Sequence, residues 1–375
     1  MNRHLMCCGD ATDLDTFSNT PYFLLQAGIP TGLLQAGVAL HPEKLVARAR
    51  LWNLVQFLRS GKAGGFQYSL PFNTTVMKQA HLDDRPTAIL SLFPFLPPTP
   101  WPRRWSVDFY IDATTKQIYE DYKAGERIGE HVKRAALGRE REAYRQAGVV
   151  ICMCQWAADS VIRDYGIDPA KVHVVVGGAN FDEGSLKTLP AGPPPAPPTE
   201  DQPLRLGLLG KYWERKGGPF LLELVDALAE RGVPAVVRAI GIDPAALPAH
   251  PRLQPLGFIS KKTALPDLVR ELQSWHFGTL FSEAEASPRS NLECLRLGVP
   301  VITHAVGGIA STLPDDGCGK LFPSHPNPAD VAAWVAARLD PYDAYLGWRA
   351  ALGGRAHEFT WAAAVQQMAP LLNRA

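Results

Sequence analysis

The chain has 375 residues, more than one hydrophobic core usually serves, so two domains are expected. It contains 38 basic against 37 acidic residues, and this net charge of +1 gives no indication of a nucleic-acid partner. There is no run of about 18 apolar residues that would suit a membrane span, and the start, MNRHLMCCGD, contains no apolar signal region, so we expect a cytoplasmic protein.

The first half of the chain contains several short apolar segments that predict buried strands. One helix with regularly spaced apolar residues, 157–166, precedes the last of them. The predicted strands cover residues 4–8, 88–93, 106–112, 149–154 and 171–176.

Residues 41–62, HPEKLVARARLWNLVQFLRSGK, predict a basic amphipathic helix that contains Trp52. Helices of this composition can lie on anionic membranes. The same pattern is more often found on an ordinary surface helix, so the sequence leaves peripheral membrane contact, such as at the inner face of the membrane, as an open alternative.

A proline-rich stretch, LPAGPPPAPPTEDQP, covers residues 189–203. It has seven prolines and no periodic apolar pattern, which favours an extended spacer over a packed element. We therefore expect it to link two domains of similar size.

The second half alternates between strand-like and helix-like segments. Such alternation predicts an α/β domain with a parallel sheet, and ligands on such sheets bind beyond the carboxyl ends of the strands. With a similar first half, we expect two α/β domains facing each other across a cleft. The predicted strands are 204–210, 235–241, 252–258, 276–282 and 299–304, and the helices are 218–232, 264–273 and 288–298.

The stretch EAEASPRSNLE, residues 283–293, predicts a helix that begins at a ligand site. Ser287 is a favoured N-cap and Pro288 a favoured first helical residue, and a helix N-terminus attracts anions. Glu285 and Glu293 would lie roughly 8 Å or more apart, too far to share a proton. They would instead hold different parts of one ligand, and paired carboxylate acceptors suit sugar hydroxyls. Two solvated surface glutamates are the alternative.

The stretch GLLGKYWERKGG, residues 207–218, is a strand followed by Gly210, Lys211, Arg215 and Lys216 at the start of a helix. A strand, a glycine and a basic loop are how α/β proteins present cations and N–H groups to a diphosphate. A charged loop on a solvated face is the plainer alternative.

Together these stretches resemble the family-4 retaining glycosyltransferases of GT-B fold, over most of residues 148–375. Glu285 and Glu293 match the family's E-x7-E signature, and GKYWERKG (210–217) matches its G-[RK]-x4-KG loop. Four further blocks resemble the family: residues 148–175, which resemble the end of its first domain, residues 298–308 and 317–323, and the last helix, 359–368.

The resemblance implies a domain organisation. Residues 1–188 would form the acceptor-side Rossmann-like domain, 189–203 the linker and 204–354 the nucleotide-sugar-binding Rossmann-like domain. Residues 355–375 would form a helix that crosses back to the first domain.

The resemblance also implies roles in donor binding. Glu285 would contact hydroxyls of the donor sugar, Glu293 would contact the ribose, and Lys211 and Lys216 would neutralise the departing diphosphate beside Gly210. The remaining implied donor contacts are the backbone of Ser287, Pro288, Arg289, Ser290 and Asn291, and Gly241, Phe258 and Ile259 near the base.

The chain departs from the family pattern in three places. The family's PNGVD is VGGAN here (176–180), and residues 9–22 replace its Gly-Gly phosphate loop. Asp112 stands where relatives often have His, so it is either catalytic or simply a loop or N-cap acid. On the acceptor side, the polar and aromatic character of two loops selects Asn19, Thr20, Gln67 and Tyr68.

The implied activity is transfer of a sugar from a nucleotide sugar to a glycan, lipid or small-molecule acceptor, with no cofactor and no metal. The six cysteines lack zinc-site spacing, in keeping with this. Two alternatives stay open: another GT-B enzyme such as a sugar-nucleotide epimerase or hydrolase, and a non-catalytic sugar-nucleotide-binding partner of a transferase.

Overall fold

A computed structural model describes residues 2–82, 86–190 and 192–373. The chain divides into two units: unit 1 comprises Met1–Val176 and Ala364–Ala375, and unit 2 comprises Gly177–Ala363. Helix α13 (Trp361–Leu372) begins in unit 2 and ends in unit 1. The described part of the proline-rich stretch, 189–190 and 192–203, belongs to unit 2, because the chain changes unit earlier, at Gly177.

Unit 1 is built on one parallel six-stranded sheet in the order β2-β1-β3-β4-β5-β6. The order reverses between β1 and β3, which makes the adjoining carboxyl ends a switch point where α/β proteins commonly bind ligands. The strands are β1 (Asn2–Met6), β2 (Ala36–Gly37), β3 (Thr87–Ser91), β4 (Trp105–Ile111), β5 (Val150–Cys152) and β6 (Val172–Val174).

The described residues of unit 1 form six α-helices in addition to the end of α13, which is attached to the sheet. The guanidinium of Arg3 in β1 donates to the carbonyl of Leu372 at 2.6 Å. The helices are α1 (Thr20–Gly28), α2 (Val46–Ser60), α3 (Leu70–Met77), α4 (Thr115–Glu120), α5 (Glu130–Gln146) and α6 (Gln155–Arg163).

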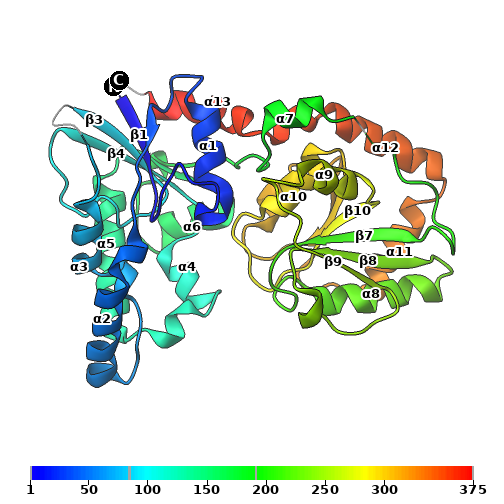
Figure 1. Cartoon of the computed structure of the whole chain (residues 1–375), viewed down its shortest axis with the longest axis horizontal. Helices are drawn as coiled ribbons and strands as arrows, with labels where there is room; N and C mark the ends of the chain where they lie inside the picture. The colour runs from blue at the N-terminus through cyan, green and yellow to red at the C-terminus, as the bar shows by residue number, and fades with distance from the viewer. Residues whose placement is uncertain (1, 83–85, 191, 374–375) are drawn as a thin grey trace. The chain divides into compact units, whose positions relative to one another are not determined.

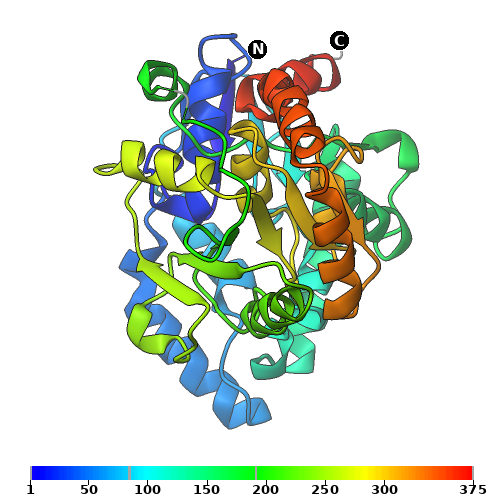
Figure 2. The same cartoon turned by 90° about the vertical axis from the view of Figure 1, so that its right-hand side faces the viewer.

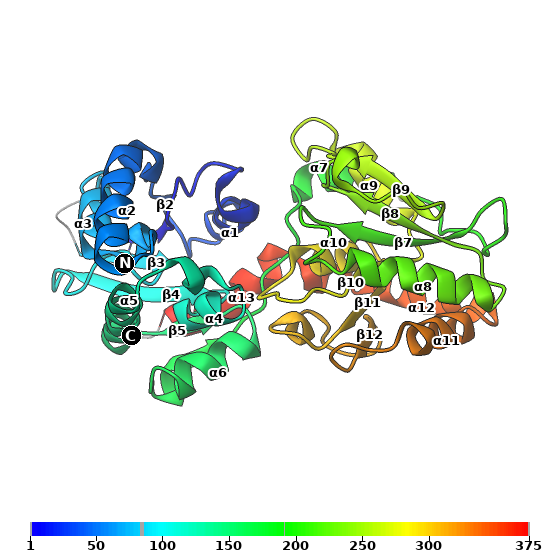
Figure 3. The same cartoon turned by 90° about the horizontal axis from the view of Figure 1, so that it is seen from below.

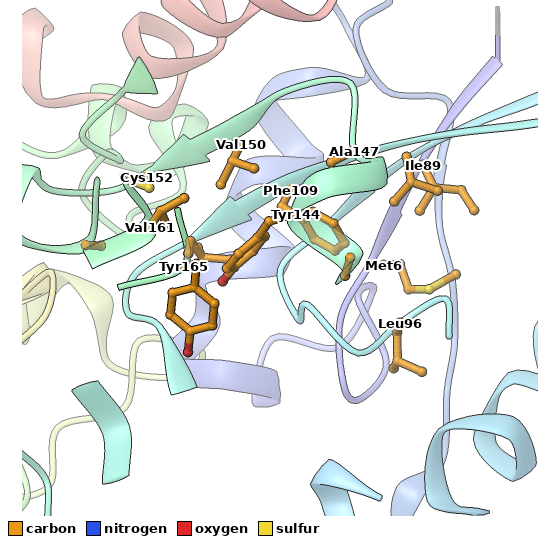
Figure 4. Packing of buried hydrophobic residues seen from close by; sticks show 14 of the residues in the cluster. Met6, Ile89, Leu96, Phe109, Tyr144, Ala147, Val150, Cys152, Val161 and Tyr165 are labelled. Carbon is orange, nitrogen blue, oxygen red and sulfur yellow. The ribbon is translucent and has the colours of Figure 1, made fainter. Parts of the chain in front are cut away.

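The core of unit 1 packs aromatic rings from α5 against the sheet. Phe109 of β4 lies 5.7 Å from the ring of Tyr144, which in turn lies 5.4 Å from that of Tyr165, both edge to face (Figure 4). The buried carboxylate of Glu140 accepts hydrogen bonds from both tyrosine hydroxyls and from the backbone N–H of Thr115. These bonds satisfy a charge that would otherwise be costly to bury, and they hold the start of α4 on α5.

Unit 2 contains a second parallel six-stranded sheet, in the order β12-β11-β10-β7-β8-β9. This is the order of a doubly wound Rossmann sheet, and its switch point lies between β7 and β10. The strands are β7 (Leu204–Leu209), β8 (Ala235–Ile240), β9 (Leu253–Gly257), β10 (Phe277–Leu280), β11 (Val301–His304) and β12 (Gly319–Phe322).

Helices cover both faces of this second sheet. Helices α9 and α10 lie on one side of the strands and α8 on the other (Figure 1), and α8 packs beside α11 (Figures 2 and 3). The helices of unit 2 are α7 (Glu183–Thr188), α8 (Gly218–Glu230), α9 (Leu265–Gln273), α10 (Arg289–Arg296), α11 (Pro328–Arg338) and α12 (Tyr342–Gly354).

The predicted fold class is confirmed, since each unit is a parallel α/β sheet with helices on it. The strands have apolar sequences because both of their faces are covered. Within the described residues, no helix combines the length and the apolar character that a bilayer span requires.

Candidate functional site

The candidate site of unit 2 is formed by the two loops at the switch point of its sheet. One loop, 210–217, follows β7 and leads into α8; the other, 281–288, follows β10 and leads into α10. Because β7 and β10 are adjacent and parallel, both loops leave the sheet at the same edge. The two sequence motifs, 74 residues apart at Lys211 and Glu285, therefore come from neighbouring strands.

Lys216 and Glu285 form an ion pair between these loops. Nζ of Lys216 lies 2.5 Å from Oε2 of Glu285, and only 11% and 12% of the two side chains are exposed. Removing Glu285 would leave the nearly buried Lys216 ammonium without its carboxylate partner, and breaking a buried pair in this way costs about 3–5 kcal/mol. The pair therefore holds both functional groups in fixed positions.

Arg215 adds a second cation at Glu285. Its Nη1 lies 3.2 Å from Oε2 of Glu285 and donates to the carbonyl of Ala284 at 2.7 Å. The carbonyl of Arg215 accepts from the backbone N–H of Glu283 and from the hydroxyl of Ser282. The sequence analysis placed Arg215 in the basic loop but assigned it no role. In the structure, Arg215 joins the two loops.

The backbone of Glu285 is supported from the strand beyond β10. Its carbonyl accepts from the N–H of Gly308 at 2.8 Å. At the end of β11, Nε2 of His304 donates to the carbonyl of Ser282 at 2.9 Å, while its Nδ1 accepts from the N–H of His325. Burial lowers the pKa of His304, which keeps the ring in the neutral form that these two bonds require. The sequence reasoning missed this support.

Glu293, one turn inside α10, has its own cation. Nζ of Lys261 lies 2.5 Å from Oε1 of Glu293, whose side chain is only 3% exposed. Lys261 also lies 5.4 Å from the ring centre of Phe181. Lys261 was missed by the sequence analysis, although it lies only two residues after Ile259, which was selected for the base.

The start of α10 differs from the prediction. Ser287 is not the N-cap: the helix begins at Arg289, and Pro288, with ψ of 117°, occupies the cap position. The hydroxyl of Ser287 instead accepts from Nη2 of Arg289 at 3.1 Å. Among the described residues Ser290 Oγ is buried without a hydrogen-bond partner, whereas Asn291 donates to the hydroxyl of Thr312.

Arg289 also accounts for one departure from the family pattern. Its guanidinium lies 5.1 Å from the ring centre of Trp361 and donates to the carbonyl of Gly178. A Cβ at Gly177, where the family has Asn, would lie 2.1 Å from Nη1 of Arg289, so this position is packed too closely for a larger residue. Nε1 of Trp361 donates to Oδ1 of Asn180 in the same stretch.

The other donor-side candidates differ in how far their side chains are exposed to solvent. Lys211 is exposed, in contrast to Lys216. Gly210 and Gly241 directly follow β7 and β8, and a Cβ on Gly241 would approach the Gly210 carbonyl to 2.6 Å. Beyond β9, the side chain of Phe258 is 76% exposed and Ile259 is half-buried. An exposed aromatic ring at this edge is available to a ligand.

In unit 1, Asp112 lies half-buried at the end of β4. It is not the cap of α4, because Thr114 occupies that position and forms a capping box with Gln117. The carbonyl of Asp112 accepts from the thiol of Cys154.

The acceptor-side candidates lie on two loops of unit 1. Asn19, with φ of 67°, occupies the N-cap position of α1, and Thr20 is the first residue of that helix. Gln67 is exposed. Tyr68 is only 5% exposed and packs edge to face against Phe95 and Tyr119. Its ring is therefore part of an aromatic cluster.

In the described parts of both units, no three or more His, Cys, Asp and Glu side chains are grouped so that they could hold a metal ion.

Comparison with known proteins supports the resemblance. No family model matches the chain. It is 26% identical over 261 residues to D-inositol 3-phosphate glycosyltransferase 2 of Catenulispora acidiphila. The match covers 64% of this chain and 59% of the relative, so the chain spans less than two thirds of that protein.

Solved structures show the fold. Sucrose-phosphate synthase from Thermosynechococcus elongatus has a TM-score of 0.65 at 17% identity, covering 99% of this chain and 98% of that one. Anabaena HepE in complex with UDP and glucose has a TM-score of 0.60 at 15% identity, covering 99% of both chains. The lipopolysaccharide outer core galactosyltransferase WaaB has a TM-score of 0.63 at 12% identity, covering 99% of both. The predicted resemblance to GT-B glycosyltransferases is confirmed.

The packing of the basic loop leads to a first prediction. Gly217 has φ of +83°, and an added Cβ would lie 2.2 Å from the carbonyl oxygen of Phe281. Gly217→Ala is expected to reduce the free energy of unfolding by about 2–5 kcal/mol, from the left-handed backbone and the clash together. Urea denaturation measures this change.

Gly232→Ala is the matched control, because Gly232 has φ of +75° with no atom within 4 Å of the added Cβ. It is expected to cost only about 1–2 kcal/mol, from the backbone alone. Equal destabilisation by both substitutions would contradict close packing of the two loops.

Proposed function

We propose that this chain is a metal-independent retaining glycosyltransferase of the family-4 type, which moves a sugar from a nucleotide sugar to an acceptor hydroxyl. The observation that supports this most strongly is the buried Lys216–Glu285 pair at the switch point between β7 and β10. Such a switch point is where α/β sheets bind nucleotides. The names of the relative and of the fold neighbours support transfer of a sugar.

The diphosphate would lie between the basic loop and the start of α10. Lys216, Arg215 and the more exposed Lys211 supply positive charge from one loop. The first turn of α10 supplies backbone N–H groups and the unpartnered hydroxyl of Ser290. A ligand oxygen at this point would satisfy a buried group that has no partner in the described protein.

The two carboxylates would hold the two ends of the donor. Glu285 lies beside the cations, where the bond between sugar and phosphate must break, so it suits the sugar hydroxyls. Glu293 lies inside α10 and is paired with Lys261, which lies two residues after the base candidate Ile259, so Glu293 suits the ribose. HepE has been solved with UDP-glucose bound, and UDP is therefore the first nucleotide to test.

In the reaction, the bond between the anomeric carbon and the diphosphate oxygen breaks, and the acceptor oxygen bonds to the same face of that carbon. The acceptor proton leaves with the nucleoside diphosphate. Charge builds up on the diphosphate oxygen as this happens, and Lys216, Arg215 and the α10 N-terminus are placed to stabilise it. Asp112 and the loop with Asn19 and Thr20 remain our candidates for the acceptor side.

A direct test incubates the protein with several nucleotide sugars, with and without candidate acceptors, and follows release of the nucleotide. Release that depends on an acceptor, with a product of unchanged anomeric configuration, is the expected result. Release without an acceptor would identify a hydrolase, and binding without any turnover would identify a non-catalytic partner.

The basic loop yields the second prediction. Lys216→Ala is expected to weaken UDP binding at least tenfold, because a charge-assisted hydrogen bond contributes about 1.5–3 kcal/mol. Lys211→Ala is expected to weaken it by less, because water screens the exposed Lys211. Calorimetric titration with UDP measures both effects.

Arg231→Ala is the control, since Arg231 lies at the opposite end of α8 from the loop. UDP affinity unchanged in both lysine variants would refute the assignment of the diphosphate.

The third prediction separates the carboxylates. Glu285→Gln is expected to lower kcat at least tenfold, a loss of about 1.4 kcal/mol of transition-state stabilisation. It should not weaken UDP binding, because neutralising Glu285 leaves Lys216 and Arg215 free to contact the diphosphate. Glu293→Gln is expected to weaken UDP and the donor alike, because both contain the ribose. Steady-state kinetics and UDP titration are both needed.

The double variant Glu293→Gln/Lys261→Met is the control for the freed lysine, because it removes the ion pair as a unit. If Glu285→Gln weakens free UDP while Glu293→Gln does not, the two roles are reversed.

The fourth prediction concerns metal. Because cationic side chains and a helix end would stabilise the leaving diphosphate, excess EDTA is expected to leave turnover within about twofold of its untreated value. Activity is measured by nucleotide release after gel filtration into chelator. Loss of activity with recovery on adding Mg²⁺ or Mn²⁺ would place the protein in a metal-dependent class.

A further inference from the structure

Helix α2 presents an apolar surface to solvent. Among the described residues, twelve large hydrophobic side chains are exposed, and six of them lie on this one helix of 15 residues. In Figure 1, α2 runs along the outer edge of unit 1. The six residues are Val46, Leu51, Leu54, Val55, Phe57 and Leu58, with exposed fractions between 41% and 76%.

The helix is inverted relative to an ordinary surface helix. Leu51, Leu54, Val55 and Leu58 follow the i, i+3, i+4, i+7 spacing of a single helix face, and all four are exposed. The opposite face of the helix is formed by the residues that lie two positions before each of these four. They are Ala49, Trp52, Asn53 and Gln56, and they are buried or half-buried. The apolar stripe therefore points away from the protein.

Specific polar contacts hold α2 in this orientation. The indole Nε1 of Trp52 donates to the carbonyl of Gly64 at 3.0 Å. Gln56, only 3% exposed, lies 2.8 Å from the imidazole Nε2 of His131. Arg48 donates to the hydroxyl of Thr75 at 3.0 Å. Trp52, the aromatic residue that made this helix a membrane candidate in the sequence, thus faces the protein, and the leucines face outward.

Positive charge is concentrated around the same stripe. Residues 44–62 contain five of the 38 basic residues and none of the 37 acidic ones, so the segment has a net charge of +5. The remainder of the chain has 33 basic against 37 acidic residues, a net charge of −4. The basic residues of the segment are Lys44, Arg48, Arg50, Arg59 and Lys62.

We propose that α2 binds the surface of a lipid bilayer that contains anionic lipids. The helix would lie parallel to the surface, with Leu51, Leu54 and Leu58 inserted at the boundary between headgroups and acyl chains. Arg50, Arg59 and Lys62 would contact the anionic headgroups, which attract basic residues near a membrane surface. At about 22 Å, α2 is too short to span a bilayer, so the contact would be peripheral.

A second copy of the chain is the other partner that an apolar stripe could bind. Two copies that met through α2 would bring two segments of charge +5 together, which is unfavourable. An anionic surface complements that charge instead. The charge distribution thus favours lipid over self-association.

The fifth prediction tests this with sedimentation of the intact protein with vesicles. We expect binding to vesicles of phosphatidylcholine with about one third phosphatidylglycerol, and at least tenfold weaker binding to phosphatidylcholine alone. Leu54→Ser/Leu58→Ser and Arg59→Gln/Lys62→Gln should each reduce binding to the anionic vesicles at least tenfold. Because these side chains are exposed, UDP affinity and melting temperature should not change in either variant.

Ile29→Ser is the matched control, because Ile29 is an exposed apolar residue of unit 1 outside α2, with 44% exposure. It should bind vesicles like the wild type. Absence of binding to the anionic vesicles would overturn the proposal. So would a dimer in gel filtration that Leu54→Ser/Leu58→Ser converts to a monomer, because the stripe would then be an interface between copies. Neither outcome bears on sugar transfer, which is tested separately.

Discussion

The candidate site depends on one constraint, the burial of opposite charges between two loops of the unit 2 sheet. Glu285 lies almost buried at the carboxyl end of β10, and it is stable there because Lys216 and Arg215 contact it from the loop after β7. A buried carboxylate without such partners would be strongly destabilising. The cations that stabilise the buried carboxylate are the same ones that the proposed diphosphate site would use. On this proposal, the packing of the loops and the binding of a ligand would depend on one set of charges.

A second buried carboxylate of unit 2 is also paired with a lysine. Glu293 in α10 is buried beside Lys261, which follows β9. Each carboxylate selected for the donor is therefore paired with a lysine. A ligand that binds here must offer hydroxyl groups to the carboxylates and negative charge to the cations. A nucleotide sugar, with its ribose, diphosphate and hexose, has both kinds of group in one molecule.

Unit 1 shows a different use of burial. Its helix α2 is attached through Trp52, Gln56 and Arg48, while its leucines are exposed. An amphipathic sequence determines that a helix has two faces, but it does not determine which of them faces the protein. In α2 it is the polar face that packs on the protein, because its side chains form hydrogen bonds with Gly64, Thr75 and His131. The apolar face is exposed, and we propose a lipid surface as its partner.

The sequence by itself determined the α/β class, most of the strands, and the two motifs that approach each other after β7 and β10. Apolar runs and helical periodicity are local signals, so they can be recognised without knowledge of the tertiary structure. Strand β12 and helix α5 were among the elements not identified, because β12, with the sequence GKLF, is not an apolar run, and α5 is mostly charged apart from its buried side. The pairing of Lys261 with Glu293, the support of Ser282 by His304 and the orientation of α2 were decided only by the tertiary structure. Each of these features depends on contacts between residues far apart in the chain. A charged or polar side chain has many possible partners, and the tertiary structure determines which of them lies close enough to pair with it.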